Sequence, residues 1–140
     1  MALPTHLTLE VVTPERPLIR EQVDEVILPA ANGYLGVRPG HTPLLAMLNI
    51  GQLSYRKGQE TFHLAVAFGF AEVLPDRVTI LARTAEKPEE IDLKRAETAR
   101  DRAQERLARP TLEMDFERAR IAMMKALVRL QVASRARVRS

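Results

Sequence analysis

The chain has 140 residues, of which 46% are hydrophobic and 28% charged, with a formal net charge of +3 at pH 7. This length allows one or two small domains of a globular protein. Cysteine is absent, which excludes disulfides, cysteine-ligated zinc, iron–sulfur clusters and thiol catalysis. The start has no signal-peptide pattern, and no apolar run approaches the ~18 residues of a transmembrane helix.

Glycine and proline divide the sequence into two parts. All six glycines precede residue 70, and seven of the nine prolines precede residue 76. Short apolar runs between frequent turn residues are typical of β-structure, whereas the Ala, Arg, Glu, Leu and Met beyond Pro88 favour helices. We therefore predict a β-domain over residues 1–87 and a helical domain over residues 88–140.

The first part shows the alternation expected of half-buried strands. It is clearest from His6 to Val11 and from Thr61 to Ala67. Further apolar runs cover 23–28, 35–37, 44–48, 51–55, 70–74 and 78–82, with turns at 14–17, 29–33, 56–59 and 75–77. This spacing predicts about nine short strands in an antiparallel β-sandwich.

The second part predicts an antiparallel two-helix hairpin. Asp92 is the expected N-cap of a helix that runs to about Ala108, before a break at residues 109–111. The second helix is expected over 113–133, with a heptad seam of Leu112, Phe116, Ala119, Met123, Ala126, Leu130 and Ala133. The first helix offers Leu93, Ala96, Ala103 and Leu107. Alanine removes little apolar area from water, so we expect a marginal hairpin that can open.

The C-terminal part is strongly basic. From Arg118 onward there are seven basic residues and no acidic one. Such a tail favours nucleic acid, an acidic protein surface or phosphate as partner, and it is also compatible with a solvated helix face. A nucleic-acid-binding module that uses this helix is therefore the alternative function. Against it, Phe116 is the only aromatic residue beyond residue 70, so no platform for base stacking is present.

Several segments carry a family resemblance. Residues 33–45 read GYLGVRPGHTPLL and are followed by Leu48 and Gly51. This pattern resembles the epsilon subunit of bacterial F-type ATP synthase, as do residues 69–73 and 78–82. Residues 91–96, IDLKRA, resemble the nucleotide motif of that family. The resemblance covers the whole chain and departs at Phe68, where the family usually has a second glycine before Gly69.

The resemblance implies a non-catalytic rotor subunit of the proton-translocating ATP synthase, on the cytoplasmic face of the bacterial plasma membrane. The β-sandwich would bind the gamma subunit and touch the c-ring, without insertion into lipid. The helical hairpin would permit turnover when folded. When extended, it would reach the alpha and beta subunits and inhibit ATP hydrolysis. No catalytic residue, metal ligand or required cofactor is implied.

The resemblance also implies a rotor interface in the segment 31–42. Its candidate residues are Asn32, Tyr34 and His41. Many family members have an acid at the position of Tyr34, so the contact with the c-ring differs here. His41 has no neighbouring serine or acid that would make it a catalyst, and we interpret it as an interface or loop-packing residue.

A regulatory ATP site is expected on the hairpin. Antiparallel pairing about Pro110 would bring Arg102 opposite Arg118 and Arg95 opposite Lys125. It would also place Asp92 near Arg129. Converging cations repel one another unless an anion lies among them, and a triphosphate meets that need. The alternative is a hairpin held by salt bridges with no ligand.

The resemblance assigns roles within this ATP site. Asp92 and Ala96 would face the adenine, with Glu86 nearby. Phosphates would be held by Arg95, Arg102, Arg118 and Arg129. Lys125 stands where strong binders have arginine, and a lysine cannot form the bidentate fork. We expect binding without hydrolysis.

Overall fold

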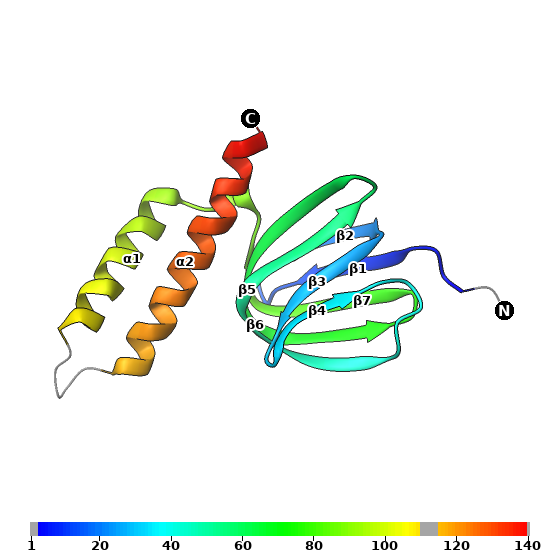
Figure 1. The fold of residues 1–140 in the computed structure, drawn as a ribbon, viewed down its shortest axis with the longest axis horizontal. Coiled ribbons are helices and arrows are strands. Elements are labelled where there is room, and N and C mark those ends of the chain that lie inside the picture. Colours follow the sequence, from blue (N-terminus) through cyan, green and yellow to red (C-terminus); the bar gives the residue numbers. More distant parts are fainter. Residues whose placement is uncertain (1–2, 110–114, 140) are drawn as a thin grey trace. The chain divides into compact units, whose positions relative to one another are not determined.

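The computed structural model describes residues 3–109 and 115–139, with side chains described as far as Arg135. The chain divides into two compact units, Met1–Glu86 and Lys87–Ser140. The first unit contains the strands β1 (Leu7–Val12), β2 (Pro17–Val23), β3 (Glu25–Ala30), β4 (Gly33–Val37), β5 (Leu44–Lys57), β6 (Glu60–Leu74) and β7 (Arg77–Glu86). The second contains the short helix η1 (Pro88–Glu90) and the helices α1 (Leu93–Ala108) and α2 (Phe116–Arg139). Figure 1 shows both units.

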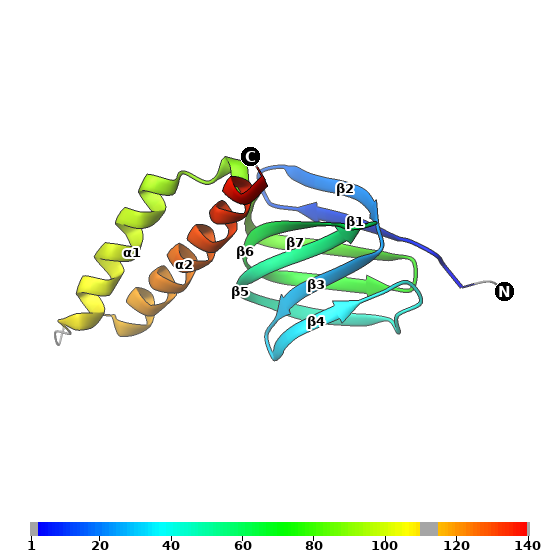
Figure 2. The same ribbon diagram turned by 45° about the horizontal axis from the view of Figure 1, so that its top comes forward.

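The seven strands form one sheet in the order β2-β1-β7-β6-β5-β3-β4. Figures 1 and 2 show that the sheet is strongly curved. Most neighbouring strands are antiparallel, and the predicted β-sandwich followed by a helical hairpin is confirmed as the fold class. The pair β1 and β7 is parallel, with Leu9 opposite Val78. These two strands can be parallel because the other strands, rather than a tight hairpin, connect them.

Alternation along the strands builds the core of the first unit. In β1, Leu7, Leu9 and Val11 are fully buried, whereas the residues between them are partly exposed. The largest fully buried side chains of the unit also include Leu28, Leu53, Leu64 and Ile80. A period of two places alternate residues on opposite faces, so each strand contributes one face to this core.

Two strands are longer than the sequence predicted. The runs 44–48 and 51–55 are parts of β5, and the runs 61–67 and 70–74 are parts of β6. The pairing of β5 with β6 continues across the predicted gaps, since Leu48 pairs with Gly69 and Ile50 pairs with Ala67. In β6 the interruption is a local kink at Phe68 and Gly69, which have φ of 61° and 127°, and the register with β5 and β7 is the same on both sides of it. The prediction of about nine short strands was wrong for this reason.

The predicted turn at 56–59 is confirmed as the β5–β6 hairpin. Gly58 has φ of 63°, a conformation that glycine adopts at little cost. Its backbone N–H donates to Oδ2 of Asp24 at 2.7 Å. The run predicted at 23–28 divides at Asp24 into the end of β2 and the start of β3.

The second unit is an antiparallel helix pair (Figures 1 and 2). Its buried residues are mostly alanines: Ala96 and Ala103 on α1, and Ala119, Ala126 and Ala133 on α2. They recur every seven residues, which is the spacing that brings one helix face repeatedly onto its partner. The alanine-rich seam predicted from the sequence is therefore confirmed at these positions.

Two details of the predicted hairpin were wrong. Phe116 is 53% exposed although it was placed in the seam. The second helix continues to Arg139 rather than ending at Ala133. The predicted start at Glu113 and the seam residue Leu112 lie outside the described residues.

Candidate functional site

The N-terminal turn of α1 is fixed by Asp92. As the N-cap residue, Asp92 accepts a hydrogen bond at Oδ1 from the backbone N–H of Arg95 at 3.1 Å. A carboxylate at this place satisfies an N–H group that the helix leaves without a partner and complements the positive end of the helix dipole. The predicted capping role of Asp92 is thus confirmed.

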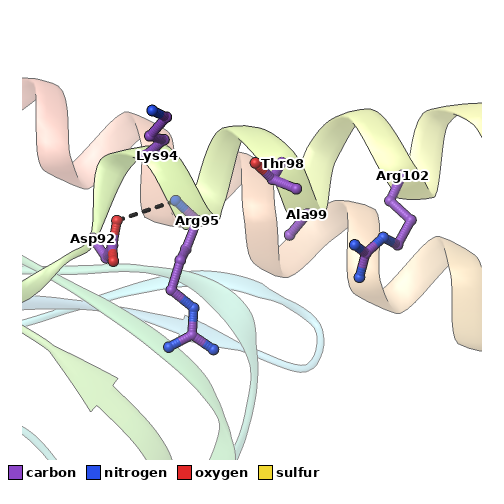
Figure 3. Close-up of a pocket in the computed structure, with 6 residues that line it drawn as sticks. All are labelled: Asp92, Lys94, Arg95, Thr98, Ala99 and Arg102. Atoms are coloured by element: carbon purple, nitrogen blue, oxygen red, sulfur yellow. Dashed lines mark hydrogen bonds between the residues drawn. The ribbon is translucent and has the colours of Figure 1, made fainter.

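An open surface hollow follows one face of α1. Its lining consists of Asp92, Lys94, Arg95, Thr98, Ala99 and Arg102. Positions 92, 95, 99 and 102 are separated by three, four and three residues, which places them on one side of a helix. Figure 3 shows the side chains of Arg95 and Arg102 extending from the same side of α1, while the Lys94 side chain points away from them. The hollow therefore presents two guanidinium groups beside one carboxylate.

The structure brings together some of the predicted ATP residues. Asp92, Arg95 and Arg102 share the hollow. Ala96 is fully buried in the seam, so in this conformation its methyl group packs against α2 rather than lining the hollow. Three lining residues were missed by the sequence analysis: Lys94, Thr98 and Ala99. Helical spacing from Arg95 and Arg102 would have identified Thr98 and Ala99.

The remaining predicted residues are placed elsewhere. Arg118 is exposed in the first turn of α2, where its backbone N–H donates to Oδ1 of Asp115 at 3.1 Å. Lys125 and Arg129 are half-buried on α2. Glu86 ends β7 in the first unit, opposite Ala65. None of these four residues is part of the described lining of the hollow.

The predicted rotor residues lie within β4 and on either side of it. Asn32 is exposed in the turn between β3 and β4, whereas His41 follows β4 in the loop to β5. The Nδ1 atom of His41 lies 2.7 Å from the carbonyl oxygen of Thr42. Tyr34 lies within β4, is 63% exposed, and its Oη accepts a hydrogen bond from the backbone N–H of Gln52 at 3.2 Å. The three residues therefore do not form a single cluster.

Within 3–109 and 115–139, no group of three or more His, Cys, Asp or Glu side chains is arranged to hold a metal ion. No helix in this part of the chain is long and apolar enough to cross a bilayer.

Both parts of the chain match known families. Residues 6–88 match the beta-sandwich domain of the ATP synthase Delta/Epsilon chain, and residues 89–134 match its long alpha-helix domain. The ATP synthase epsilon chain of Solibacter usitatus is 51% identical over 95% of this chain and 99% of its own length. That of Syntrophobacter fumaroxidans is 47% identical over 92% of this chain and 96% of its own length.

The fold is also found in a larger assembly. One similar chain comes from a structure of the Euglena gracilis mitochondrial ATP synthase, described as OSCP/F1/c-ring in rotational state 1. It superposes with a TM-score of 0.81 at 23% identity, covering 96% of this chain and 84% of the other. At this identity the likeness concerns the fold alone.

Proposed function

Since the chain belongs to the ATP synthase Delta/Epsilon family, we propose that it couples rotation to ATP synthesis and regulates ATP hydrolysis. It is an epsilon-type subunit of the central stalk. The observation that carries the proposal is the match of both domains, in order, across most of the chain. In this role the chain supplies no catalytic group. It is held at the cytoplasmic face of the bacterial plasma membrane through its neighbours in the complex.

The β unit is the part that holds the subunit in the rotor. It has its own core of large fully buried side chains such as Leu9, Leu64 and Ile80, so it is suited to remain folded while the helices rearrange. Its partners in this role are the gamma subunit and the c-ring. In this proposal the two partners contact the turn at Asn32, the exposed ring of Tyr34 and the loop at His41, which lie at different places on the unit.

The helical unit is the regulatory part. Its seam is built mainly from alanine methyl groups. Separation of the helices therefore exposes little apolar area to water. The exposed cations of α2, among them Arg118, would then be drawn to an acidic surface on the alpha and beta subunits. The extended helices would stop the catalytic subunits from hydrolysing ATP.

A truncation experiment tests this division of roles. ATP hydrolysis by an F1 complex reconstituted with the full chain is compared with hydrolysis by one reconstituted with residues 1–87. We expect both to assemble and only the full chain to inhibit. Equal inhibition by the two forms would refute the regulatory role of the helices, and failure of both forms to assemble would refute the rotor role.

ATP is proposed as the ligand that holds the hairpin folded. The hollow on α1 fits the phosphates, because Arg95 and Arg102 extend from one side and guanidinium groups bind phosphate oxygens in pairs. A ligand bound only to the folded pair stabilises it by about 2.7 kcal/mol at a hundredfold excess over its Kd. We expect binding without hydrolysis, because Asp92, the carboxylate of the described lining, serves as the helix cap.

Calorimetry with ATP tests the site. Arg95→Ala and Arg102→Ala should each weaken binding about tenfold or more, since each removes a charged hydrogen-bond donor. Arg106→Ala is the matched control, because Arg106 is exposed on the same helix and is not part of the lining. No heat at millimolar ATP, or equal binding by all three variants, would refute the site.

A further inference from the structure

The hollow on α1 has two small side chains between its arginines. Thr98 and Ala99 follow Arg95 by three and four positions and precede Arg102 by four and three. Residues three and four apart are neighbours on a helix surface, so both small side chains lie between the two arginines, as Figure 3 shows. Seven residues correspond to a rise of about 10 Å along the helix. The hollow therefore offers a row of groups rather than one point of attachment.

The side chain of Arg102 is directed along this row. Cα–Cβ bonds in a helix tilt toward its N-terminus, so a long side chain covers the turn before its own Cα atom. For Arg102 that turn carries Thr98 and Ala99. The guanidinium group of Arg102 and the side chain of Thr98 are consequently available to the same ligand.

The two small residues contribute different properties. Thr98 is exposed, and its hydroxyl can donate a hydrogen bond to a phosphate oxygen. Ala99 is half-buried and ends at a methyl group, which leaves space above the helix backbone. Asp101 lies three residues after Thr98, but it is paired with Arg100 at 3.0 Å and is not part of the described lining. The middle of the hollow thus combines a hydroxyl donor with room for an anion.

Helix stability does not account for a threonine at position 98. Thr98 is the only β-branched residue of α1, and β-branched residues form helices less readily than the straight-chain residues around it. The buried seam of α1 uses Ala96 and Ala103 instead. Threonine therefore costs α1 some stability, and a hydroxyl that binds a ligand is a reason for its presence.

We propose that Thr98 is a further ligand residue of the ATP site and that its hydroxyl donates to an oxygen of the phosphate chain. Ala99 keeps the adjoining space free for that chain. The inference rests on the proposed ATP site on α1. It assigns the row of Arg95, Thr98 and Arg102 to the phosphates, so the same row would bind inorganic triphosphate, which has no base or ribose.

Calorimetry of the full chain, with ATP and inorganic triphosphate as separate ligands, tests the role of the hydroxyl. Thr98→Val removes the hydroxyl and keeps the branched shape. It is expected to raise Kd about tenfold for both ligands, as loss of a hydrogen bond to a charged group does. Thr98→Ser is the matched control, since it retains the donor and should bind with nearly the wild-type Kd. Without ligand, the thermal transition of Thr98→Val should match that of wild type, because valine and threonine have similar helix propensities.

Ala99→Leu tests the free space. Leucine forms helices well but would fill the hollow between the arginines, so we expect it to weaken binding of both ligands at least as strongly as Thr98→Val. Ala108→Leu is the matched control, because Ala108 is exposed at the end of α1 and is not part of the described lining. Its Kd should stay at the wild-type value, and equal binding by Ala99→Leu would overturn the role of Ala99.

The outcomes separate this inference from the proposed ATP site. If the wild-type chain binds neither ligand, the ATP site itself is overturned. If the wild-type chain binds ATP and Thr98→Val binds it equally well, the ATP site stands and the role of Thr98 is overturned. A loss of affinity that Thr98→Ser shares, or wild-type binding confined to ATP, would overturn the assignment of the hydroxyl to the phosphate chain.

Discussion

Gly69, within β6, is the position where we expect an added methyl group to be least tolerated. Its φ is 127°. An added Cβ atom would overlap the carbonyl oxygen of Leu81 and lie 2.9 Å from the Cα atom of Ala82. Both contacts are with the backbone of β7, which cannot rotate aside. Backbone strain costs about 1–3 kcal/mol and overpacking about the same again. Gly69→Ala should therefore lower the free energy of unfolding by about 3 kcal/mol or more.

Urea unfolding followed by tyrosine fluorescence measures this loss. The chain has two tyrosines, Tyr34 and Tyr55, and no tryptophan, and both tyrosines lie in the same unit as β6. Gly36→Ala is the matched control, because an added Cβ atom on Gly36 meets nothing within 4 Å. Its stability should change by less than about 1 kcal/mol. Equal unfolding midpoints for the two variants would refute the argument from overlap with β7.

Two further predictions concern the helices. Asp92→Ala removes the N-cap bond to Arg95 and should destabilise α1 by about 0.5–2 kcal/mol; an unchanged thermal transition of the circular dichroism at 222 nm would contradict this. Hydrogen bonds from Arg120 to Glu117, both at 3.0 Å, hold the Glu117 pKa below its usual value of 4.5. Because folding lowers this pKa, the pair contributes to the free energy of unfolding above the unfolded-state pKa. This contribution is lost as the pH falls through the lowered value. In an NMR titration Arg120→Gln should raise the Glu117 pKa, and an unchanged value would show that the pair does not persist in solution.

Local patterns predicted where most strands occur but not how long they are, and they missed all of β2 except its last residue, Val23. Alternation located β1 and the two halves of β6, because a period of two depends only on neighbouring residues. The continuation of β6 through Phe68 could not be predicted, since it shows only in the unchanged register of β6 with β5 and β7 on both sides of that residue. A glycine at position 69 is compatible with a turn and with a strand that continues, and only the partner strands decide between them.

Local patterns also failed to predict where the hairpin seam ends. The heptad spacing located Ala119 and Ala126 correctly, but it also included Phe116, which is exposed. Phe116 is the first residue of α2, so no preceding turn of its own helix covers the ring. A spacing rule contains no information about where a helix begins, so the ends of a seam are its least predictable part.

Helical periodicity predicted which residues share one face of α1 more accurately than it predicted the ends of the hairpin seam. Asp92, Arg95 and Arg102 lie in one hollow, as a 3.6-residue period requires. The residues predicted on α2 and at the end of β7 depend on how separate elements meet, and the hollow does not include them. What the sequence can predict is therefore one helix face, while a complete ligand set depends on tertiary structure.

Tyr34 makes a contact within the chain that its place in the sequence motif did not predict. Its position in the sequence motif suggested a contact with the c-ring, yet its hydroxyl also has a role within the chain. The pairing of β3 with β5 shifts between Ile27 and Ala30, so Gln52 lies in a part of β5 that β3 does not pair. The Tyr34 hydroxyl accepts a hydrogen bond from the backbone N–H of Gln52 there.

Tyr34→Phe separates these two roles, because it keeps the exposed ring and removes the hydroxyl. Loss of one hydrogen bond should lower the free energy of unfolding of the isolated chain by about 0.5–1.5 kcal/mol. Urea unfolding followed by the fluorescence of Tyr55 measures the change. If the unfolding midpoint does not move, the hydroxyl contributes nothing to the isolated chain. Any effect of the variant on the assembled rotor would then come from a contact that Tyr34 makes with a neighbouring subunit.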